Sequence, residues 1–380
     1  MKVIVLGAGK MARGLVFDFL NNRNITDIWI VDQSKDALDI IEKKYKDSRI
    51  RTTLAGADDY AILRPLFEQA DGAVSAVPYD FNFGLSQLAV DTATHFVDLG
   101  GNNSVVEKQF GLHDKAKAKG IGIVPDCGLA PGMVSIVTAH AISELARIDS
   151  VKIRVGGLPV NPKPPLNYML VFSVHGLINE YIEPAVIIED GEIRTVPSMT
   201  DVEELEFPKP FGLLEAFYTS GGTSTLPQTY EGKIKRLDYK TIRYPGHAHI
   251  MKAMIDLGFT GTAELDLDGR KYKTRDIFEK LLGAALTHED DDVVLIRVTA
   301  KGQKAGSNKI IQYQAIEYGD PSSGLSAMMR TTAFPAAIVL QMLLSGQIKD
   351  HGVLKQEISV PTMTFMEELE KRNIKFIFMD

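Results

Sequence analysis

The alternation of apolar and polar positions predicts a regular order of strands and helices at the start of the chain. Residues 3–6 form a short apolar run followed directly by glycines, which is typical of a strand buried on both faces. Apolar residues then recur at helical spacing over residues 11–20. A second apolar run over residues 27–31 ends at Asp32. This segment is therefore predicted to be a strand, a glycine turn, a helix and a second strand.

The same alternation continues to about residue 125. The pattern predicts helices at 34–45, 59–68 and 83–92, and strands at 51–54, 72–77, 95–99 and 121–125. Strands that alternate with helices favour a parallel sheet with right-handed crossovers. Residues 1–127 are thus predicted to form an α/β domain of the Rossmann type, with a doubly wound parallel sheet.

The pattern changes beyond residue 132. Strand-like runs at 150–155, 185–188, 235–243, 293–299 and 309–317 are bounded by glycine or acidic turns. They predict a second, α+β domain over residues 128–325, built on a largely antiparallel sheet. A helix over about 326–344, rich in alanine and methionine, suggests that residues 326–350 return to the first domain.

Composition narrows the class of protein. The 380 residues carry 42 basic and 49 acidic side chains, a net charge of -7, and they include a single cysteine. The charge balance argues against nucleic acid as a partner, and one cysteine fits a reducing compartment such as the cytoplasm. Lys10 and Arg13 interrupt the apolar start too early for a signal peptide. The apolar stretch 333–344 contains Pro335 and Gln341 and is expected to be too short to cross a membrane.

The glycine turn has the residue spacing of a dinucleotide-binding site. Gly7 permits a tight turn, Gly9 lets backbone amides approach a pyrophosphate, and Ala12 allows the helix to pack closely on the strand. Lys10 and Met11 open the helix, whose free amides would face the phosphates.

Asp32 stands where a carboxylate accepts hydrogen bonds from the adenosine ribose and repels the phosphate of NADP, so NAD is the expected cofactor. Lys35 nearby would soften that preference, and a solvated strand-end acid is the simpler alternative for Asp32. Polar or glycine-rich loops also follow four later strands. Their residues with expected cofactor contacts are Asp58 at the adenine, Ala76, Val77 and Pro78 beside the nicotinamide, and Gly100.

Several segments together resemble the saccharopine dehydrogenase family over essentially the whole chain. They are the N-terminal fingerprint, Val77-Pro78-Tyr79, residues 126–132 with their Gly-Leu-Ala-Pro-Gly, residues 172–181 and residues 243–247. Within the family, residues 155–159, 214–225 and 239–244 are most similar to lysine 6-dehydrogenases.

This resemblance implies a nicotinamide-dependent reaction at a carbon bonded to nitrogen, with substrate held between the two domains. In saccharopine reductases the segment that matches residues 220–225 resembles Tyr-Pro-Asn-Arg-Asp-Ser. Here it contains glycine, threonine and serine and lacks the arginine. A smaller, less anionic substrate than saccharopine is therefore expected.

Amine oxidation requires a base, because the nitrogen must lose a proton before hydride leaves the carbon. Asp126 is the first candidate to bind or deprotonate the amine, with a structural cap as its alternative. Tyr79 is a candidate to orient the nitrogen or relay a proton, with a stacking surface for the nicotinamide as the equal alternative. Arg243 matches an α-carboxylate, although an ion pair between domains is the equal alternative. Further candidate substrate contacts are Ser220, Thr223, Tyr244, His175 and His247. The two histidines are also candidate acids or bases, with hydrogen-bonded scaffold as their alternative.

Two other groups of residues are assigned no catalytic or metal-binding role. Cys127 lies beside Asp126, which would raise the pKa of its thiol, so it is interpreted as a packing residue. The acidic run at 288–292 is interpreted as a solvated turn, and no metal is expected.

The resemblance to lysine 6-dehydrogenases implies an NAD-dependent enzyme that oxidises the ε-amine of L-lysine to 2-aminoadipate 6-semialdehyde and ammonia. The semialdehyde would cyclise to piperideine-6-carboxylate. One alternative is reductive condensation of an amine with a carbonyl compound, and another is an NAD-binding sensor without turnover. A homo-oligomer, either a dimer or a multiple of dimers, is expected, because antiparallel sheets often pair across a two-fold axis. No membrane partner is expected.

Overall fold

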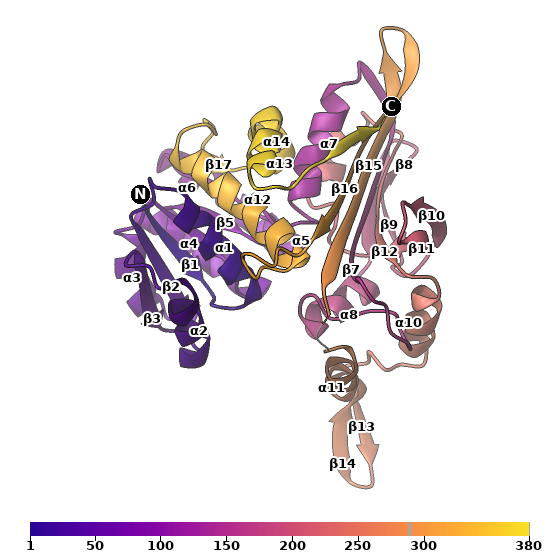
Figure 1. Ribbon diagram of the computed structural model, residues 1–380, viewed down its shortest axis with the longest axis horizontal. Helices are drawn as coiled ribbons and strands as arrows, with labels where there is room; N and C mark the ends of the chain where they lie inside the picture. The colour runs from indigo at the N-terminus through magenta and orange to yellow at the C-terminus, as the bar shows by residue number, and fades with distance from the viewer. Residues whose placement is uncertain (288–289, 380) are drawn as a thin grey trace. The chain divides into compact units, whose positions relative to one another are not determined.

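The computed structural model describes residues 1–287 and 290–379. The chain forms two compact units, coloured by residue number in Figure 1. The first contains Met1–His140 and Met329–Lys375, and the second contains Ala141–Met328 and the residues from Phe376 onward. The first unit thus extends beyond the predicted boundary at residue 127, because helix α7 (Met133–Ser143) begins in it.

The first unit contains a parallel sheet of seven strands in the order β17-β6-β5-β4-β1-β2-β3. The order changes direction between β1 and β4, and ligands bind at such a switch point in doubly wound sheets. The strands are β1 (Lys2–Leu6), β2 (Asp27–Asp32), β3 (Ile50–Leu54), β4 (Gly72–Ser75), β5 (His95–Asp98), β6 (Gly122–Val124) and β17 (Gly352–Val353).

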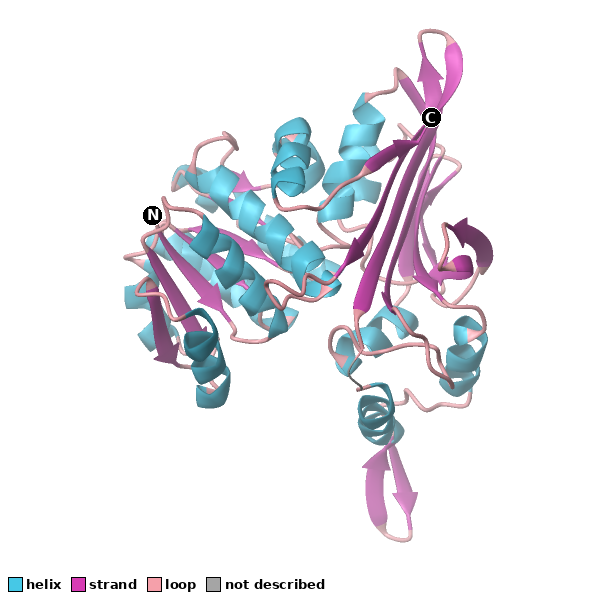
Figure 2. Ribbon diagram, in the orientation of Figure 1, coloured by secondary structure: helices cyan, strands magenta, loops and turns pink. Residues whose placement is uncertain are grey.

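Helices cover both faces of this sheet (Figures 1 and 2). Four of them lie within a few residues of the predicted ranges, whereas α5 and α6 were not predicted, because both are short and mostly polar. The helices are α1 (Lys10–Asn21), α2 (Lys35–Tyr45), α3 (Tyr60–Phe67), α4 (Asn82–Thr92), α5 (Asn103–Phe110) and α6 (His113–Ala118).

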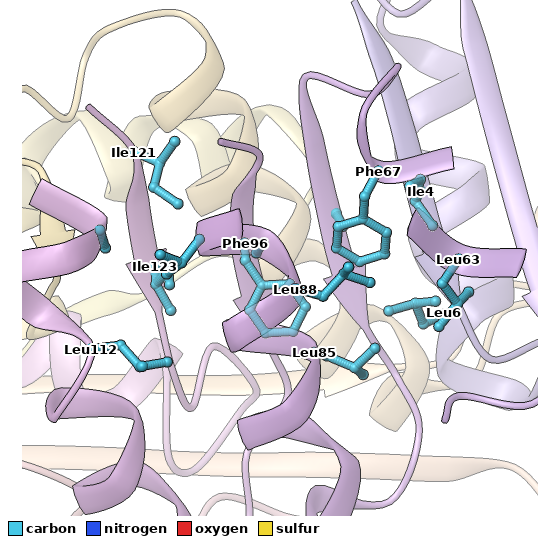
Figure 3. Packing of buried hydrophobic residues seen from close by; sticks show 14 of the residues in the cluster. Ile4, Leu6, Leu63, Phe67, Leu85, Leu88, Phe96, Leu112, Ile121 and Ile123 are labelled. Carbon is cyan, nitrogen blue, oxygen red and sulfur yellow. The ribbon is translucent and has the colours of Figure 1, made fainter. Parts of the chain in front are cut away.

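One face of the sheet packs against α3 and α4 in a continuous apolar core (Figure 3). Ile4 of β1 and Phe96 of β5 are fully buried, as are Phe67 of α3 and Leu85 of α4. Burying one such side chain contributes about 1.5–3 kcal/mol to stability relative to leaving it exposed. The core therefore fixes the sheet whose strand ends carry the candidate cofactor residues.

Helix α12 (Ala327–Leu344) joins the first unit from Met329 onward and packs along α1. The rings of Phe17 and Phe334 stack with centroids 6.2 Å apart. The helix is longer than the expected apolar stretch, and by length and composition alone it could cross a membrane. However, 83% of its apolar window is buried inside the protein, as in the core helix of a folded domain. Two further helices follow, α13 (Gln356–Ser359) and α14 (Thr362–Lys371).

The second unit contains a mixed sheet of nine strands, with the main order β10-β11-β12-β7-β15-β16-β18. All of its pairs are antiparallel except β12 with β7, so the largely antiparallel prediction is confirmed. The strands are β7 (Arg147–Pro159), β8 (Ala185–Glu189), β9 (Glu192–Val196), β10 (Glu203–Phe207), β11 (Gly212–Tyr218), β12 (Arg236–Arg243), β15 (Asp292–Lys304), β16 (Ser307–Tyr318) and β18 (Ile377–Met379). A separate hairpin pairs β13 (Glu264–Leu267) with β14 (Arg270–Lys273).

Three helices of the second unit share an apolar cluster near one end of this sheet (Figure 2). They are α8 (Val174–Ile182), α10 (His247–Asp256) and α11 (Thr274–Leu286), and a short helix α9 (Leu226–Tyr230) lies elsewhere in the unit. Tyr168, Tyr181 and Phe217 are buried in the cluster. It surrounds the charged and aromatic groups described below.

Candidate functional site

The glycine turn after β1 is shaped for a ligand. Gly7 has a φ of 97°, and its N–H donates to the carbonyl of Val31 at 2.7 Å. A Cβ on Gly7 would lie 2.9 Å from the carbonyl oxygen of Ala76, so the turn sits directly against the β4 loop. Gly9 begins α1 without a side-chain cap, and a Cβ there would meet no described atom within 4 Å. The first amides of α1 thus face open space, as pyrophosphate binding requires.

Asp32 ends β2 beside this turn, as the sequence predicts. One carboxylate oxygen accepts the N–H of Ala8 at 2.6 Å, and the other accepts the N–H of Ser34 at 2.7 Å. Lys35 forms an ion pair with Asp39, one helical turn away. Asp32 therefore fixes the glycine turn in addition to any contact with a ribose.

The other cofactor candidates lie on loops at the same edge of the parallel sheet. Ala76 and Val77 are half-buried against Gly7, and Met11 is half-buried at the start of α1. Lys10, Asp58 and Pro78 are exposed. Since β1, β4 and β5 are neighbours, their loops suit an extended dinucleotide, and the residues present fit NAD(P).

Asp126 follows β6 in a left-handed conformation, with a φ of 59° and only 1% of its surface exposed. Its Oδ1 accepts the N–H of Gly101 at 3.2 Å, and its own N–H donates to Oδ1 of Asp98 at 3.1 Å. A Cβ on Gly100 would lie 1.8 Å from Oδ1 of Asp126, so Gly100 makes room for this carboxylate. The ring of Tyr79 lies 3.3 Å from the Cβ position of Gly101, which brings Tyr79 and Asp126 to one loop.

Asp98 and Gln109 support the loop that carries Asp126 through buried hydrogen bonds. The sequence did not reveal this role. The Gln109 amide donates to Asp98 at 2.7 Å and to Ser86 at 2.8 Å, and all three side chains are buried. Burial raises the pKa of Asp98 to about 6. Burial also raises the pKa of the Cys127 thiol well above its usual value, which agrees with a packing role.

Arg243 ends β12 in the second unit and is 2% exposed. Its Nε donates to the hydroxyl of Tyr181 at 2.8 Å, and Nη1 donates to the carbonyl of Ile242 at 2.9 Å. The guanidinium carbon lies 4.5 Å from the centroid of the Tyr168 ring. Burial opposes its charge, but Tyr181, Tyr168 and Glu180 raise its pKa above the usual value. Arg243 is thus held as a fixed cation.

His247 is linked to Arg243 through Tyr181. Its Nδ1 must donate to the carbonyl of Leu166 at 3.0 Å, so Nε2 accepts from the Tyr181 hydroxyl at 2.9 Å. Burial, followed by the charge of Arg243, lowers the pKa of His247 to about 3. Because the ring is neutral and both of its nitrogens are hydrogen-bonded, His247 fits the scaffold alternative better than a role as an acid or base.

Glu180 faces the same cluster from α8 and was not singled out from the sequence. It is half-buried, and burial raises the pKa of its carboxyl to about 7 while Arg243 opposes that change. Its carboxylate forms no hydrogen bond or ion pair with any residue in the described ranges. A sequence signal existed: Glu180 follows Leu177 and Ile178 and precedes Tyr181, so it adjoins the apolar face of a helix.

The remaining predicted contacts are bonded to backbone groups or lie at the surface. The hydroxyls of Ser220, Thr223 and Tyr244 donate to the carbonyls of Asn179 (3.4 Å), Val186 (3.2 Å) and Pro159 (3.0 Å). The Ser220 N–H also donates to the Glu180 carbonyl at 3.0 Å, so Ser220 borders the cluster. His175 is exposed at the start of α8 and contacts Glu279 at 3.1 Å. The structure does not bring His175 to Arg243.

Within residues 1–287 and 290–379, no three acidic, histidine or cysteine side chains gather as a metal site. Of the acidic run that was assigned no metal, His288 and Glu289 lie outside the described residues. Asp290 receives a hydrogen bond from Asn161 at 3.0 Å, and Asp292 accepts the N–H groups of Ala327 and Met328 at 2.6 and 2.8 Å. Asp292 is therefore a helix cap rather than part of a solvated turn.

Comparison with known protein families identifies the family to which the chain belongs. The family described as "Saccharopine dehydrogenase NADP binding domain" matches residues 3–124, and "Saccharopine dehydrogenase C-terminal domain" matches residues 128–374. The chain belongs to the saccharopine dehydrogenase family. It therefore carries an NAD(P)-binding domain of an oxidoreductase family.

Two relatives of this family member are distant in sequence but match along nearly their whole length. Saccharopine dehydrogenase [NADP(+), L-glutamate-forming] of Saccharomyces cerevisiae is 21% identical, covering 96% of each chain. Carboxynorspermidine synthase of Vibrio cholerae is 22% identical, covering 94% of this chain and 92% of its own. The apo structure of the S. cerevisiae saccharopine dehydrogenase superposes with a TM-score of 0.80 at 20% identity, covering 100% of both chains, which shows the same fold.

Proposed function

We propose that the protein catalyses the NAD-dependent oxidative deamination of the ε-amine of L-lysine. The products are 2-aminoadipate 6-semialdehyde and ammonia, and the semialdehyde cyclises to piperideine-6-carboxylate. One observation carries the choice of substrate: the second unit presents the buried guanidinium of Arg243, while residues 220–225 contain no arginine. The guanidinium of Arg154, also buried in this unit, is already paired with Glu203 and Asp238. One fixed cation suits the single carboxylate of lysine better than the three carboxylates of saccharopine.

The cofactor would be held by the first unit. Gly9 leaves room for the pyrophosphate, and Gly7 lets the turn lie against Ala76 and Val77, which would border the nicotinamide. Asp32 would receive the ribose hydroxyls. When bound, NAD supplies the acceptor for the hydride. The carboxylate of Asp32 favours NAD over NADP by repelling the additional phosphate, although the relatives named above include an NADP-dependent enzyme.

The protein's own residues bind and deprotonate the amine. Arg243 holds the α-carboxylate, so that the extended side chain presents its ε-carbon for oxidation. Asp126 accepts a proton from the ε-ammonium, because hydride can leave only from the neutral amine. Tyr79, beside Gly101 and Asp126, orients the nitrogen. Water then adds to the imine carbon, and the carbon–nitrogen bond breaks to release ammonia.

A direct assay tests this reaction. Purified protein mixed with NAD and L-lysine under alkaline conditions should accumulate NADH, followed by absorbance. Asp126→Asn keeps the oxygen that accepts the Gly101 N–H, yet it should lower turnover by about 10²–10⁴-fold, the usual contribution of a general base. NAD affinity measured by calorimetry should stay unchanged in this variant. If the wild type binds NAD, oxidises no amine and reduces no mixture of an amine with a carbonyl compound, the protein is a sensor rather than an enzyme.

Reductive condensation is the second candidate, and the likeness to a carboxynorspermidine synthase favours it. It predicts oxidation of NADPH only when an amine and a carbonyl compound are supplied together. Absence of NADH formation with lysine, combined with that dependence on two substrates, would replace the lysine proposal.

The cellular location, the substrate class and the oligomeric state are proposed from the sequence arguments above. We infer that the protein acts in the cytoplasm, on a small amino acid, as a homo-oligomer. Nucleic acid and membranes are not expected partners of a chain with a net charge of -7.

A further inference from the structure

We propose that Glu180 and Arg243 form a paired site for the head group of an α-amino acid, with Glu180 binding the α-ammonium and Arg243 the α-carboxylate. This inference rests on the proposed function, since it concerns the same substrate, and it adds the residue that selects the α-amine. Every group in the argument belongs to the second unit.

Arg243 has N–H donors that are available to a ligand. Its Nε and Nη1 are bonded to Tyr181 and to the Ile242 carbonyl, whereas its Nη2 donates to no residue within the described ranges. The hydroxyl of Tyr168, whose ring lies against the guanidinium, is fully buried and also lacks a hydrogen-bond partner there. Buried polar groups are almost always satisfied, so a buried hydroxyl without a partner, on a ring that lies against a guanidinium with an unused donor, indicates an absent acceptor. A carboxylate satisfies both.

Glu180 supplies the opposite charge close by. The charge of Arg243 opposes the rise in the pKa of Glu180, and the charge of Glu180 raises the pKa of Arg243. The two side chains nevertheless do not form an ion pair. A carboxylate alone at Arg243 would be repelled by ionised Glu180, and an ammonium alone at Glu180 would be repelled by Arg243. A zwitterionic α-amino acid carries both charges on adjacent atoms and satisfies the pair without a net charge.

The pair is also held in place before any ligand arrives. The chain of hydrogen bonds from Arg243 through Tyr181 and His247 to the Leu166 carbonyl fixes the guanidinium. The Ser220 N–H, bonded to the Glu180 carbonyl, ties α8 to the segment after β11. Such fixed groups lose little conformational freedom on binding, which favours selectivity.

L-Norleucine tests the site without the reaction, because it has the α-amino acid head group and no ε-amine. Calorimetry with NAD-saturated protein should show binding of L-norleucine, with hexanoate and pentan-1-amine at least ~30-fold weaker. Glu180→Gln should weaken L-norleucine by ~30-fold or more, the usual loss for one partner of a buried charge pair, and should leave hexanoate unchanged or tighter. The melting temperature of the variant checks that it folds.

Glu183→Gln is the matched control, because it removes the same charge from the end of the same helix, where the carboxyl faces Arg275 and His175 instead. It should leave L-norleucine binding unchanged. Equal affinity for L-norleucine and hexanoate in the wild type, or unchanged L-norleucine binding in folded Glu180→Gln, overturns the paired site.

The two proposals fail in different ways. Binding of L-norleucine that depends on Glu180, without oxidation of lysine, retains the head-group site and rejects the proposed reaction. Oxidation of lysine with the same KM in wild type and Glu180→Gln retains the reaction and rejects the role of Glu180.

Discussion

His247 couples the stability of the second unit to pH. The ring is 2% exposed, and both of its hydrogen bonds fit the neutral form. Its pKa is about 3 in the folded protein, against about 6.5 when unfolded. Since the unfolded chain takes up the proton first, His247 stabilises the fold above pH 6.5, and this stabilisation is lost as the pH falls from about 6.5 toward 3.

His247→Gln should remove that dependence. Between pH 6 and 4 the free energy of unfolding of the wild type should fall more steeply than that of the variant, by ~1 kcal/mol per pH unit for one proton. At pH 8 the variant should be less stable by about 1–3 kcal/mol, because hydrogen bonds in the cluster are lost. Urea denaturation at several pH values measures both effects. Parallel pH curves for the two proteins would contradict the neutral, buried ring.

Asp32 makes the second residue-scale prediction, which concerns the choice of cofactor. Asp32→Asn removes the charge that would repel the additional phosphate of NADP. The ratio of kcat/KM for NADP to that for NAD should rise by ~30-fold, corresponding to about 2 kcal/mol of like-charge repulsion. Asp58→Asn is the control, since it removes an equal charge from an exposed loop that is predicted to contact the adenine, which both cofactors share. An unchanged ratio in Asp32→Asn would remove the argument for NAD.

At the scale of elements, helices α1 and α12 meet through a position that only glycine fits. A Cβ on Gly14 would lie 2.6 Å from the Cβ of Ala333 and 3.0 Å from the carbonyl oxygen of Met329. Gly14→Ala should therefore destabilise the protein by about 1–3 kcal/mol through overpacking, although alanine favours a helix. Thermal or urea denaturation measures this change.

A double-mutant cycle separates that clash from a general loss of packing. Ala333→Gly removes the nearest atom, so Gly14→Ala should cost less in the Ala333→Gly background, with a coupling of about 0.5–3 kcal/mol. Additive effects of the two substitutions would mean that α1 and α12 do not pack as described.

Elements with a strong pattern were predictable, and weaker ones were not. The apolar run of β1 and the helical spacing of α1 predicted these elements correctly, because each element buries one continuous set of side chains. Strand β17 has two residues, and α5 mixes polar and apolar positions, so neither has a period to detect. The hairpin of β13 and β14 was also missed, because all of its residues are exposed.

At the scale of the whole chain, the two parts of the candidate site differ in how much the sequence reveals. The cofactor turn is local, with Gly7, Gly9 and Asp32 close in sequence. The Arg243 cluster instead joins Tyr168, Tyr181 and His247 from separate segments, through hydrogen bonds that span as many as 81 positions from Leu166 to His247. Arg243 and His247 were candidates from the sequence, but no local pattern records such a network, so the roles of Tyr168 and Tyr181 and the hydrogen bonds between these residues emerged only from the fold.

A homo-oligomer is the state expected of the whole molecule, and the surface of the second unit supplies a physical reason. Leu267 of the β13–β14 hairpin and Leu281 of α11 are 57% and 58% exposed, and Ile377 on the edge strand β18 is 65% exposed. Exposed apolar side chains and unpaired strand edges favour association with another chain. Sedimentation velocity at micromolar concentration should therefore show a species of two or more 41.8 kDa chains. A single species with the mass of one chain would mean that these side chains remain in water, and that the substrate site is complete within one copy.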